Sequence, residues 1–212
     1  MNLLITGTDT GVGKTVITVA MLKNARGFGI DCVGMKPICS GGNEDVIAIL
    51  EAIDHAEPEH LVNPIWLRTP ASPYAASVIE DRLLDIDSIR DAFRQLASSH
   101  DWVLVEGAGG LTVPITREYD FRDLARDLHL SVVIVAANRL GAINHTRLTV
   151  EAAKSSGLDC RMVIISEVEP LSEPSQASNY GLLQDLLDIP VMYVEHGQTD
   201  LTEVVHHLHG KS

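Results

Sequence analysis

The segment Gly7 to Thr15, Gly-Thr-Asp-Thr-Gly-Val-Gly-Lys-Thr, combines the residue types that bind phosphate. It follows a short apolar run and precedes a helical stretch, the strand–turn–helix context in which a glycine-rich loop cradles phosphate. Backbone N–H groups at the helix N-terminus point at the anion, and the helix dipole favours its negative charge. Lys14 can reach the outer phosphates, and the Thr15 hydroxyl can bind Mg²⁺. Five residues separate Gly7 from Gly13, one more than in the common pattern, so an extended variant of the loop is predicted.

A second lysine and an acidic residue follow the next apolar run. Lys36 stands at the predicted carboxyl end of a strand, where a buried ammonium needs an anion or the mouth of a site. We interpret Lys36 as a second cation acting opposite Lys14 on a transferring phosphoryl group; a surface lysine at a strand end is the alternative. Asp45 opens the next predicted helix, where an acidic residue usually complements the helix dipole. The functional alternative for Asp45 is a carboxylate that faces a metal ion.

The run from Asp101 to Gly110 leads an apolar strand into Glu106 and then into a glycine-rich segment. A carboxylate at the end of a strand beside a phosphate loop is well placed to bind Mg²⁺. The glycines that follow would let backbone amides approach a charged ligand, although structural glycine turns are also common. Because Mg²⁺ prefers octahedral oxygen ligands, we predict that Thr15, Glu106 and Asp45 bind it together with phosphate oxygens.

Two further segments carry groups that could bind ligands. Residues Arg139 to His145 follow a predicted strand just as a helix begins, and exposed N–H groups there could hold a carboxylate. Helix capping by Asn144 is the simpler interpretation. Near the C-terminus, His206, His207 and His209 have no carboxylate or cysteine partner nearby in sequence, so we predict that they are solvated rather than metal-bound.

Short β-branched runs alternate with longer helical segments, a pattern typical of a mostly parallel sheet flanked by helices on both faces. The predicted strands are residues 2–6, 31–36, 102–106, 131–136, 160–165 and 190–194. The predicted helices are residues 13–26, 44–55, 86–99, 121–128, 143–156, 176–187 and 199–208. Residues 57–80 are expected to be irregular, with a candidate edge strand at 61–67. The predicted class is α/β of the P-loop NTPase type, with ligands beyond the carboxyl ends of the strands.

The composition limits the partners. The chain has 212 residues, with 16 basic and 29 acidic residues and a formal net charge of −13, so nucleic acids and anionic membranes are not expected as main partners. The three cysteines are widely spaced and match no zinc or redox pattern, as expected for reduced thiols. Without a secretory leader or an apolar run near the roughly 20 residues that span a bilayer, a soluble cytoplasmic chain is expected. Residues 1–212 are predicted to form one domain.

Four segments together resemble the signature blocks of the dethiobiotin synthetase family, in the same order: residues 7–15, 36–41, 105–110 and 140–145. The resemblance runs from residue 1 to about residue 165, and more weakly to the end. It implies an ATP- and Mg²⁺-dependent ligase of biotin biosynthesis that forms dethiobiotin from 7,8-diaminononanoate and CO₂. In this family an amine captures CO₂ as a carbamate, the carbamate attacks the γ-phosphate, and the second amine displaces phosphate to close the ureido ring.

The resemblance also implies roles for residues at matching positions. Lys36 corresponds to the catalytic lysine, with Lys14 stabilising carbamate and phosphate charge. Residues of the substrate site would be Thr10, Lys36, Ser40, Gly141, Ala142, Ile143, Asn144 and Tyr180, with 141–144 acting across a homodimer interface. Residues of the nucleotide site would be Gly11, Val12, Gly13, Lys14, Thr15, Val16, Asp45, Glu106, Gly107, Ala108, Gly109, Ser166, Glu167, Val194, Glu195 and His196. Thr15, Asp45 and Glu106 would form the metal shell.

The chain departs from the family pattern on the nucleobase side. Family members commonly have Asn-Asp or a similar pair where Ser166 and Glu167 stand, and an Ile-Pro-hydrophobic turn where Val194 to Gly197 stand. A hydroxyl and a carboxylate offer a different pattern of donors and acceptors from an amide. We therefore expect weaker or altered base selectivity, with other nucleoside triphosphates accepted.

A dimerising ATPase switch of the ParA/MinD type is the main alternative from another functional class. Such proteins typically carry a second lysine early in the phosphate loop, whereas residues 8–12 here are Thr, Asp, Thr, Gly and Val. A regulatory nucleotide-binding domain without catalysis is a third possibility, and the presence of Lys36 counts against it.

Overall fold

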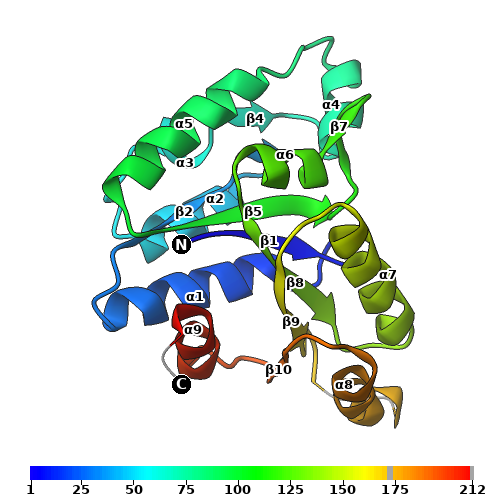
Figure 1. The fold of residues 1–212 in the computed structure, drawn as a ribbon. Coiled ribbons are helices and arrows are strands. Elements are labelled where there is room, and N and C mark those ends of the chain that lie inside the picture. The colour runs from blue at the N-terminus through cyan, green and yellow to red at the C-terminus, as the bar shows by residue number, and fades with distance from the viewer. Residues whose placement is uncertain (171–173, 211–212) are drawn as a thin grey trace.

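Six parallel strands form the central sheet in the computed structural model, which describes residues 1–170 and 174–210 (Figure 1). The strands are β1 (Asn2–Gly7), β2 (Cys32–Met35), β5 (Trp102–Gly110), β8 (Ser131–Ala137), β9 (Cys160–Ser166) and β10 (Val191–Val194). They lie in the order β10-β9-β8-β1-β5-β2, and every neighbouring pair is parallel. The predicted α/β class with a parallel sheet is confirmed.

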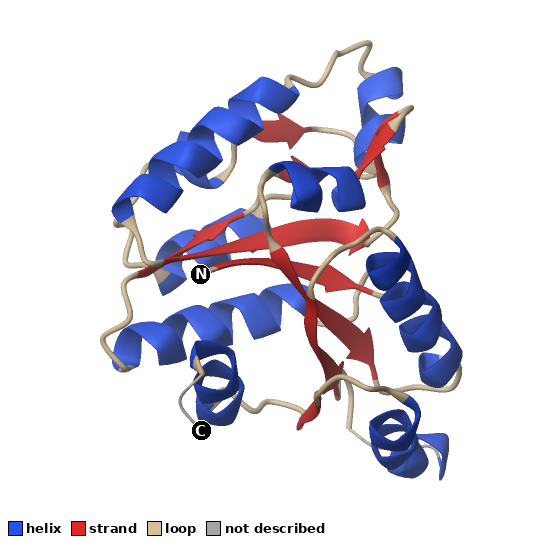
Figure 2. Ribbon diagram, in the orientation of Figure 1, coloured by secondary structure: helices blue, strands red, loops and turns tan. Residues whose placement is uncertain are grey.

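Helices cover both faces of this sheet, as Figure 2 shows. The helices are α1 (Lys14–Gly27), α2 (Glu44–Ala52), α3 (Glu59–Val62), α4 (Pro73–Ile79), α5 (Ile86–Ser99), α6 (Phe121–Asp127), α7 (Ala142–Ser155), α8 (Pro174–Leu186) and α9 (Thr202–His209). Helix α1 packs against α2 and α9 on one side, while α5 and α6 lie on the other side (Figure 1). None of the described helices is long and apolar enough to cross a membrane.

The strands are apolar along their length because the sheet is covered on both faces. Leu3, Leu4 and Ile5 of β1 are fully buried, and so are the apolar residues 132–136 of β8. Helix α5 shows the complementary pattern, with Ile89, Ala92, Phe93 and Leu96 turned inward at helical spacing. Its N-terminus is capped by the Asp85 side chain, which accepts hydrogen bonds from the N–H groups of residues 87 and 88.

Residues 57–80 differ from the prediction, because three short elements form there: α3, β4 (Ile65–Leu67) and α4. The predicted edge strand at 61–67 is correct only in its last residues, and β4 does not join the central sheet. It pairs with β3 (Ile38–Ser40) in a small parallel sheet. A second small sheet joins β6 (Pro114–Thr116) to β7 (Tyr119–Asp120). The pairing of β3 with β4 joins residues far apart in sequence, and β6 and β7 are only two or three residues long, so local periodicity did not predict either sheet.

Two strand boundaries near the predicted site also differ. Strand β2 ends at Met35, so Lys36 lies one residue beyond it and donates its backbone N–H to the Val62 carbonyl. Strand β5 continues to Gly110, so the glycines after Glu106 extend the strand instead of forming a turn. Glu106 therefore lies inside β5, four residues before its end.

His100 links three segments of the chain at the amino ends of β2 and β5, away from the predicted site. The His100 imidazole, just after α5, lies with Nδ1 2.7 Å from an Asp31 oxygen and Nε2 3.0 Å from a Glu57 oxygen. Partial burial lowers the pKa of His100, but hydrogen bonds to the two carboxylates more than offset this, so the pKa is raised above the usual 6.5. Protonated His100 therefore stabilises the fold.

Replacement of His100 by glutamine should flatten the pH dependence of stability. The contribution of His100 is fully present below the unfolded-state pKa near 6.5 and is lost as pH rises through the higher folded-state pKa. Urea unfolding of the wild type should therefore show a loss of about 1 kcal/mol across this window that His100→Gln lacks. His60→Gln, at an exposed histidine, is the matched control. Parallel pH curves for His100→Gln and the wild type would contradict the assignment.

Candidate active site

The phosphate loop between β1 and α1 has the backbone that an anion site needs. Gly11 and Gly13 adopt φ values of 71° and 92°, a region that glycine enters without strain. A side chain on Gly7 would approach the Asp9 carbonyl oxygen to 2.6 Å, so this position also requires glycine. Helix α1 begins at Lys14 with no acidic residue in its first turn, which leaves the positive end of its dipole free for an anion. The loop geometry fits a phosphate group.

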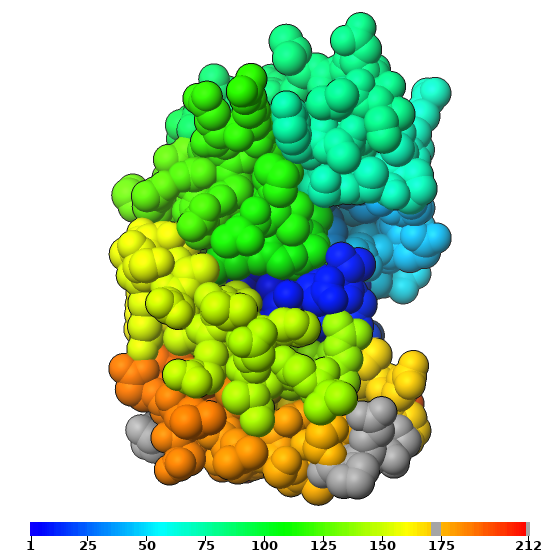
Figure 3. Space-filling view, turned by 90° about the vertical axis from the view of Figure 1, so that its right-hand side faces the viewer, coloured from blue at the N-terminus to red at the C-terminus, as the bar shows by residue number. Residues whose placement is uncertain are grey.

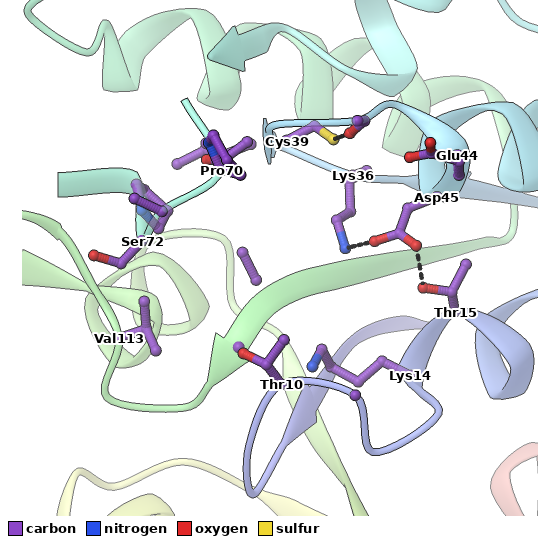
Figure 4. Close-up of a pocket in the computed structure, with 18 of the residues that line it drawn as sticks. Thr10, Lys14, Thr15, Lys36, Cys39, Glu44, Asp45, Pro70, Ser72 and Val113 are labelled. Carbon is purple, nitrogen blue, oxygen red and sulfur yellow. Dashed lines mark hydrogen bonds and ion pairs between the residues drawn. The ribbon is translucent and has the colours of Figure 1, made fainter. Parts of the chain in front are cut away.

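Lys36 is the centre of a buried charge cluster. Its Nζ donates to Glu106 Oε1 at 2.6 Å and to Asp45 Oδ2 at 2.7 Å, and approaches the Gly107 carbonyl at 3.4 Å. Burial lowers the pKa of Lys36, but the charges of Glu106 and Asp45 more than offset this, so the pKa is raised. The ammonium therefore stays protonated and turns toward the cavity, where Figure 4 shows it beside Asp45.

Thr15 joins the two carboxylates to the phosphate loop. Its hydroxyl lies 2.7 Å from Asp45 Oδ1 and 2.8 Å from Glu106 Oε1. Burial raises the pKa of Asp45, but Lys36 and the Thr15 hydroxyl lower it overall, so this carboxyl is ionised at neutral pH. Three predicted metal ligands from α1, α2 and β5 thus meet at one point.

These oxygens fit a hard divalent cation. Glu106 is fully buried, yet its Oε2 atom has no hydrogen-bond partner among the described residues. A buried carboxylate oxygen without a partner is costly unless a ligand completes it. Two carboxylates and a hydroxyl form a small set of protein ligands for a cation that keeps water or phosphate oxygens for its other positions. No cluster of three or more His, Cys, Asp or Glu residues offers a rival metal site in residues 1–170 and 174–210.

Lys14 completes the charge distribution. Its Nζ donates to the Asp9 carbonyl at 3.0 Å. Burial and the nearby charge of Lys36 lower the pKa of Lys14 to about 8, so the two ammonium groups are close enough to repel each other. An anion between the lysines would relieve this repulsion.

Lys14, Thr15, Lys36 and Asp45 line a cavity of about 720 Å³, whereas Glu106 is fully buried and does not line it. Of the predicted residues, it is lined by Thr10, Gly11, Gly13, Lys14, Thr15, Val16, Lys36, Ser40, Asp45, Ala108 and Gly109. The remaining lining residues were not predicted: Ile38, Cys39, Gly42, Glu44, Pro70, Ala71, Ser72, Pro73, Val113 and Val168. The prolines at 70 and 73 were the only local signal for this wall. In Figure 3 the N-terminal segment that carries the phosphate loop reaches the surface between the β5 side and the α7 side.

Several predicted residues lie outside this cavity. Val12 is buried beneath the loop, and Gly107 contributes the carbonyl that faces Lys36. Gly141, Ile143 and Asn144 line a second cavity of about 770 Å³ along α7 and the end of α8. Ala142, at the start of α7, is buried. Tyr180 stacks at a tilt on Tyr193, with ring centres 5.6 Å apart.

The predicted nucleobase residues gather at the ends of β9 and β10. Ser166 is buried against the phosphate loop. A Cβ atom on Gly13 would lie only 2.8 Å from the Ser166 hydroxyl oxygen. Glu167 accepts a hydrogen bond from the Tyr193 hydroxyl at 2.8 Å and donates its backbone N–H to the Val194 carbonyl. In the turn after β10, the Glu195 N–H donates to Gln198, and His196 Nδ1 lies 2.9 Å from the Val168 carbonyl.

The C-terminal histidines lie on the exposed side of α9. The His206 ring lies 4.7 Å from that of Phe28, and the His209 ring lies 5.7 Å from that of Trp102. These two imidazoles therefore pack on aromatic side chains.

The fold and site define a P-loop nucleotide-binding protein, and a family model described as "AAA domain" matches residues 1–195. Solved structures share this fold. A plasmid partition protein from Borrelia burgdorferi B31 superposes with a TM-score of 0.56 at 10% identity, covering 99% of this chain and 96% of its own. The signal recognition particle receptor FtsY from Elizabethkingia anophelis gives 0.53 at 13% identity, covering 97% of this chain and 62% of its own. At such identities the likeness shows the fold alone.

Curated relatives define the family more narrowly. The ATP-dependent dethiobiotin synthetase BioD of Anaeromyxobacter sp. (strain Fw109-5) is 44% identical over 84% of this chain and 81% of its own length. The protein of the same name from Akkermansia muciniphila is 35% identical over 98% of this chain and 99% of its own. The chain belongs to the ATP-dependent dethiobiotin synthetase family, as its four signature segments predicted.

Replacement of Lys36 by methionine should destabilise the fold through Glu106. Removing the ammonium leaves a fully buried carboxylate without compensation, which should lower the free energy of unfolding by about 3 kcal/mol in urea titrations. The double variant Lys36→Met/Glu106→Gln should regain most of this loss, because it removes both charges. Lys23→Met, at an exposed lysine of α1, is the control. Equal stability of the single variant and the wild type would show that the pair is not buried as described.

Proposed function

We propose that this chain forms dethiobiotin from 7,8-diaminononanoate, CO₂ and a nucleoside triphosphate with Mg²⁺. The observation that carries the proposal is the cluster of Lys36, Glu106, Asp45 and Thr15, in which Lys36, Asp45 and Thr15 line the same cavity as the phosphate loop. Family membership supplies the class of reaction, because the relatives are ATP-dependent dethiobiotin synthetases. We propose further that residues 1–212 act as one catalytic domain and that the enzyme is cytoplasmic.

Charge stabilisation and positioning carry the proposed chemistry. Backbone N–H groups of the loop and Lys14 hold the triphosphate, and Thr15, Asp45 and Glu106 hold Mg²⁺. Bound Mg²⁺ would neutralise charge on the nucleotide phosphates. Lys36 would stabilise the carbamate and the phosphoryl group that it attacks, because its ammonium lies at the boundary between the metal ligands and the open cavity. Both reacting amines belong to one substrate, so holding that substrate in place supplies much of the rate.

The cavity also has the chemistry to hold a diamine. The Ser40 hydroxyl is buried without a hydrogen-bond partner among the described residues, although Ser40 lines the cavity. A ligand amine or carbamate would satisfy it. Ile38, Pro73 and Val113 give the wall an apolar part against which an alkyl chain can lie.

We propose that two chains combine to bind the substrate carboxylate. The turn at residues 141–144 lies at the positive end of α7 but outside the cavity that holds Lys36, which supports the proposal that a second copy brings its own turn to this site. Leu140 and Leu148, beside the turn, are 76% and 56% exposed, an apolar surface suited to burial. Mixing Lys36→Gln chains with Gly141→Trp chains should restore activity, because half-sites exchange. A monomer in analytical ultracentrifugation, or no complementation, would contradict shared sites.

We propose that base selectivity is relaxed. Glu167 accepts a hydrogen bond from the Tyr193 hydroxyl, and His196 Nδ1 lies near the Val168 carbonyl. The amide side chain that would read adenine in the family is therefore replaced by groups that already have other partners. In competition assays, ATP should be preferred over CTP and GTP by no more than roughly tenfold. A preference for ATP of several orders of magnitude would show that another part of the site reads the base.

Phosphate release tests the proposed function directly. Release from ATP should require both 7,8-diaminononanoate and bicarbonate, whereas an ATPase switch would hydrolyse ATP without them. Lys36→Gln should lower kcat for ring closure by about 10²–10³-fold while nucleotide binding stays within about threefold. Lys23→Gln serves as the control. Turnover of Lys36→Gln within tenfold of the wild type would show that Lys36 is not the catalytic lysine.

A further inference from the structure

The phosphate loop touches the β8–α7 turn at the carboxyl edge of the sheet. Strands β1 and β8 are parallel neighbours, so their following loops emerge side by side. The Thr8 N–H donates to the Val135 carbonyl at 3.0 Å. Beyond this backbone contact, the Arg139 guanidinium donates to Asp9 Oδ2 at 2.8 Å. This ion pair joins the side chains of the two loops.

Asp9 connects the ion pair to the phosphate-binding groups. Its second carboxylate oxygen accepts the Thr10 N–H at 2.7 Å, and its carbonyl accepts Lys14 Nζ at 3.0 Å. Arg139 and the Thr10 N–H both hold the pKa of Asp9 below its usual value, with the backbone hydrogen bond as the larger cause. A shift of Asp9 would therefore disturb the loop backbone at Thr10 and the ammonium of Lys14, which the proposed function assigns to the nucleotide phosphates.

Hydrogen bonds hold the backbone at Arg139 in place. Its carbonyl accepts the Asn179 side-chain amide at 3.1 Å and the Ala142 N–H at 3.0 Å. The preceding residue, Asn138, is buried and exchanges hydrogen bonds with Gln176 and Asn179 of α8 at 2.9–3.1 Å. Hydrogen bonds thus fix the turn to α8, and the Arg139 side chain connects the turn to the phosphate loop.

We propose that the Asp9–Arg139 ion pair couples nucleotide binding at the phosphate loop to the geometry of the turn at residues 139–144. The inference rests on the proposed function, in which this turn holds the substrate carboxylate. Arg139 is then a positioning residue, since it acts through the loop and touches neither the metal ligands nor Lys36. Both side chains are about half exposed, so the pair contributes little to stability and its removal should leave the fold intact.

Ligand titrations test the coupling. The dissociation constant of 7,8-diaminononanoate is measured by calorimetry with and without a non-hydrolysable ATP analogue, in the wild type, Arg139→Gln, Asp9→Asn and the double variant. In the wild type, the dissociation constant without the analogue should exceed the constant with it. Each single variant should lower this ratio by about fivefold. The double variant should lower it no further, because both residues serve one link. Arg94→Gln, which breaks an exposed pair with Asp91 on α5, is the control.

Hydrogen exchange separates this inference from the proposed function. Nucleotide alone should slow amide exchange at residues 139–145 in the wild type and not in Arg139→Gln, whatever the second substrate is. Failure of the diamine to bind, with this protection intact, would overturn the proposed function but keep the link between the loops. Unchanged coupling and protection in both single variants would overturn the link. Weaker nucleotide binding in Arg139→Gln but not in Asp9→Asn would also overturn it, because Arg139 would then bind phosphate directly.

Discussion

The buried ion pair between Lys36 and Glu106 is the interaction on which the site depends. Strand register creates this ion pair: Met35, the last residue of β2, pairs with Val105 of β5, so Lys36, one residue beyond β2, falls beside Glu106. Ile5 of β1 pairs with Glu106 itself, which places the phosphate loop on the other side of the same carboxylate. The order β1-β5-β2 therefore brings a cation, an acid and an anion-binding loop together before any ligand arrives.

This arrangement has an energetic cost that the surrounding core offsets. A carboxylate with no exposed surface and an unpartnered oxygen is unfavourable by itself, and a buried ion pair seldom adds net stability. The apolar strands on both sides supply the compensating burial of hydrophobic surface. Lys36 neutralises one of the two negative charges of Asp45 and Glu106, and the remaining charge favours a cation.

Most of the fold could be predicted from local sequence. Residues 86–99 show a clear helical period and form α5 within the same bounds, and the apolar strands are recognisable because both of their faces are buried. The roles that we predicted for Lys14, Lys36 and Glu106 came from residue type and from positions in the glycine-rich loop or near the ends of predicted strands. Their contacts could not be predicted, because the register between β2 and β5 joins residues 70 apart in sequence. The wall at residues 70–73 depends on the pairing of β3 with β4, which has no local signal either.

In the proposed reaction, substrate activation and substrate orientation fall to different parts of the molecule. In the proposed reaction, Lys14 and Lys36 on the cavity wall are taken up by the anionic phosphates and the carbamate, so the substrate carboxylate needs a second positive site. The N-terminus of α7 offers such a site, because it lies at the positive end of the helix dipole and has no acidic residue in its first turn. Under the proposed function, a linear substrate would place its amines at Lys36 and its carboxylate at such a turn. The length of the substrate would then keep its carboxylate away from the negative charges of the phosphates.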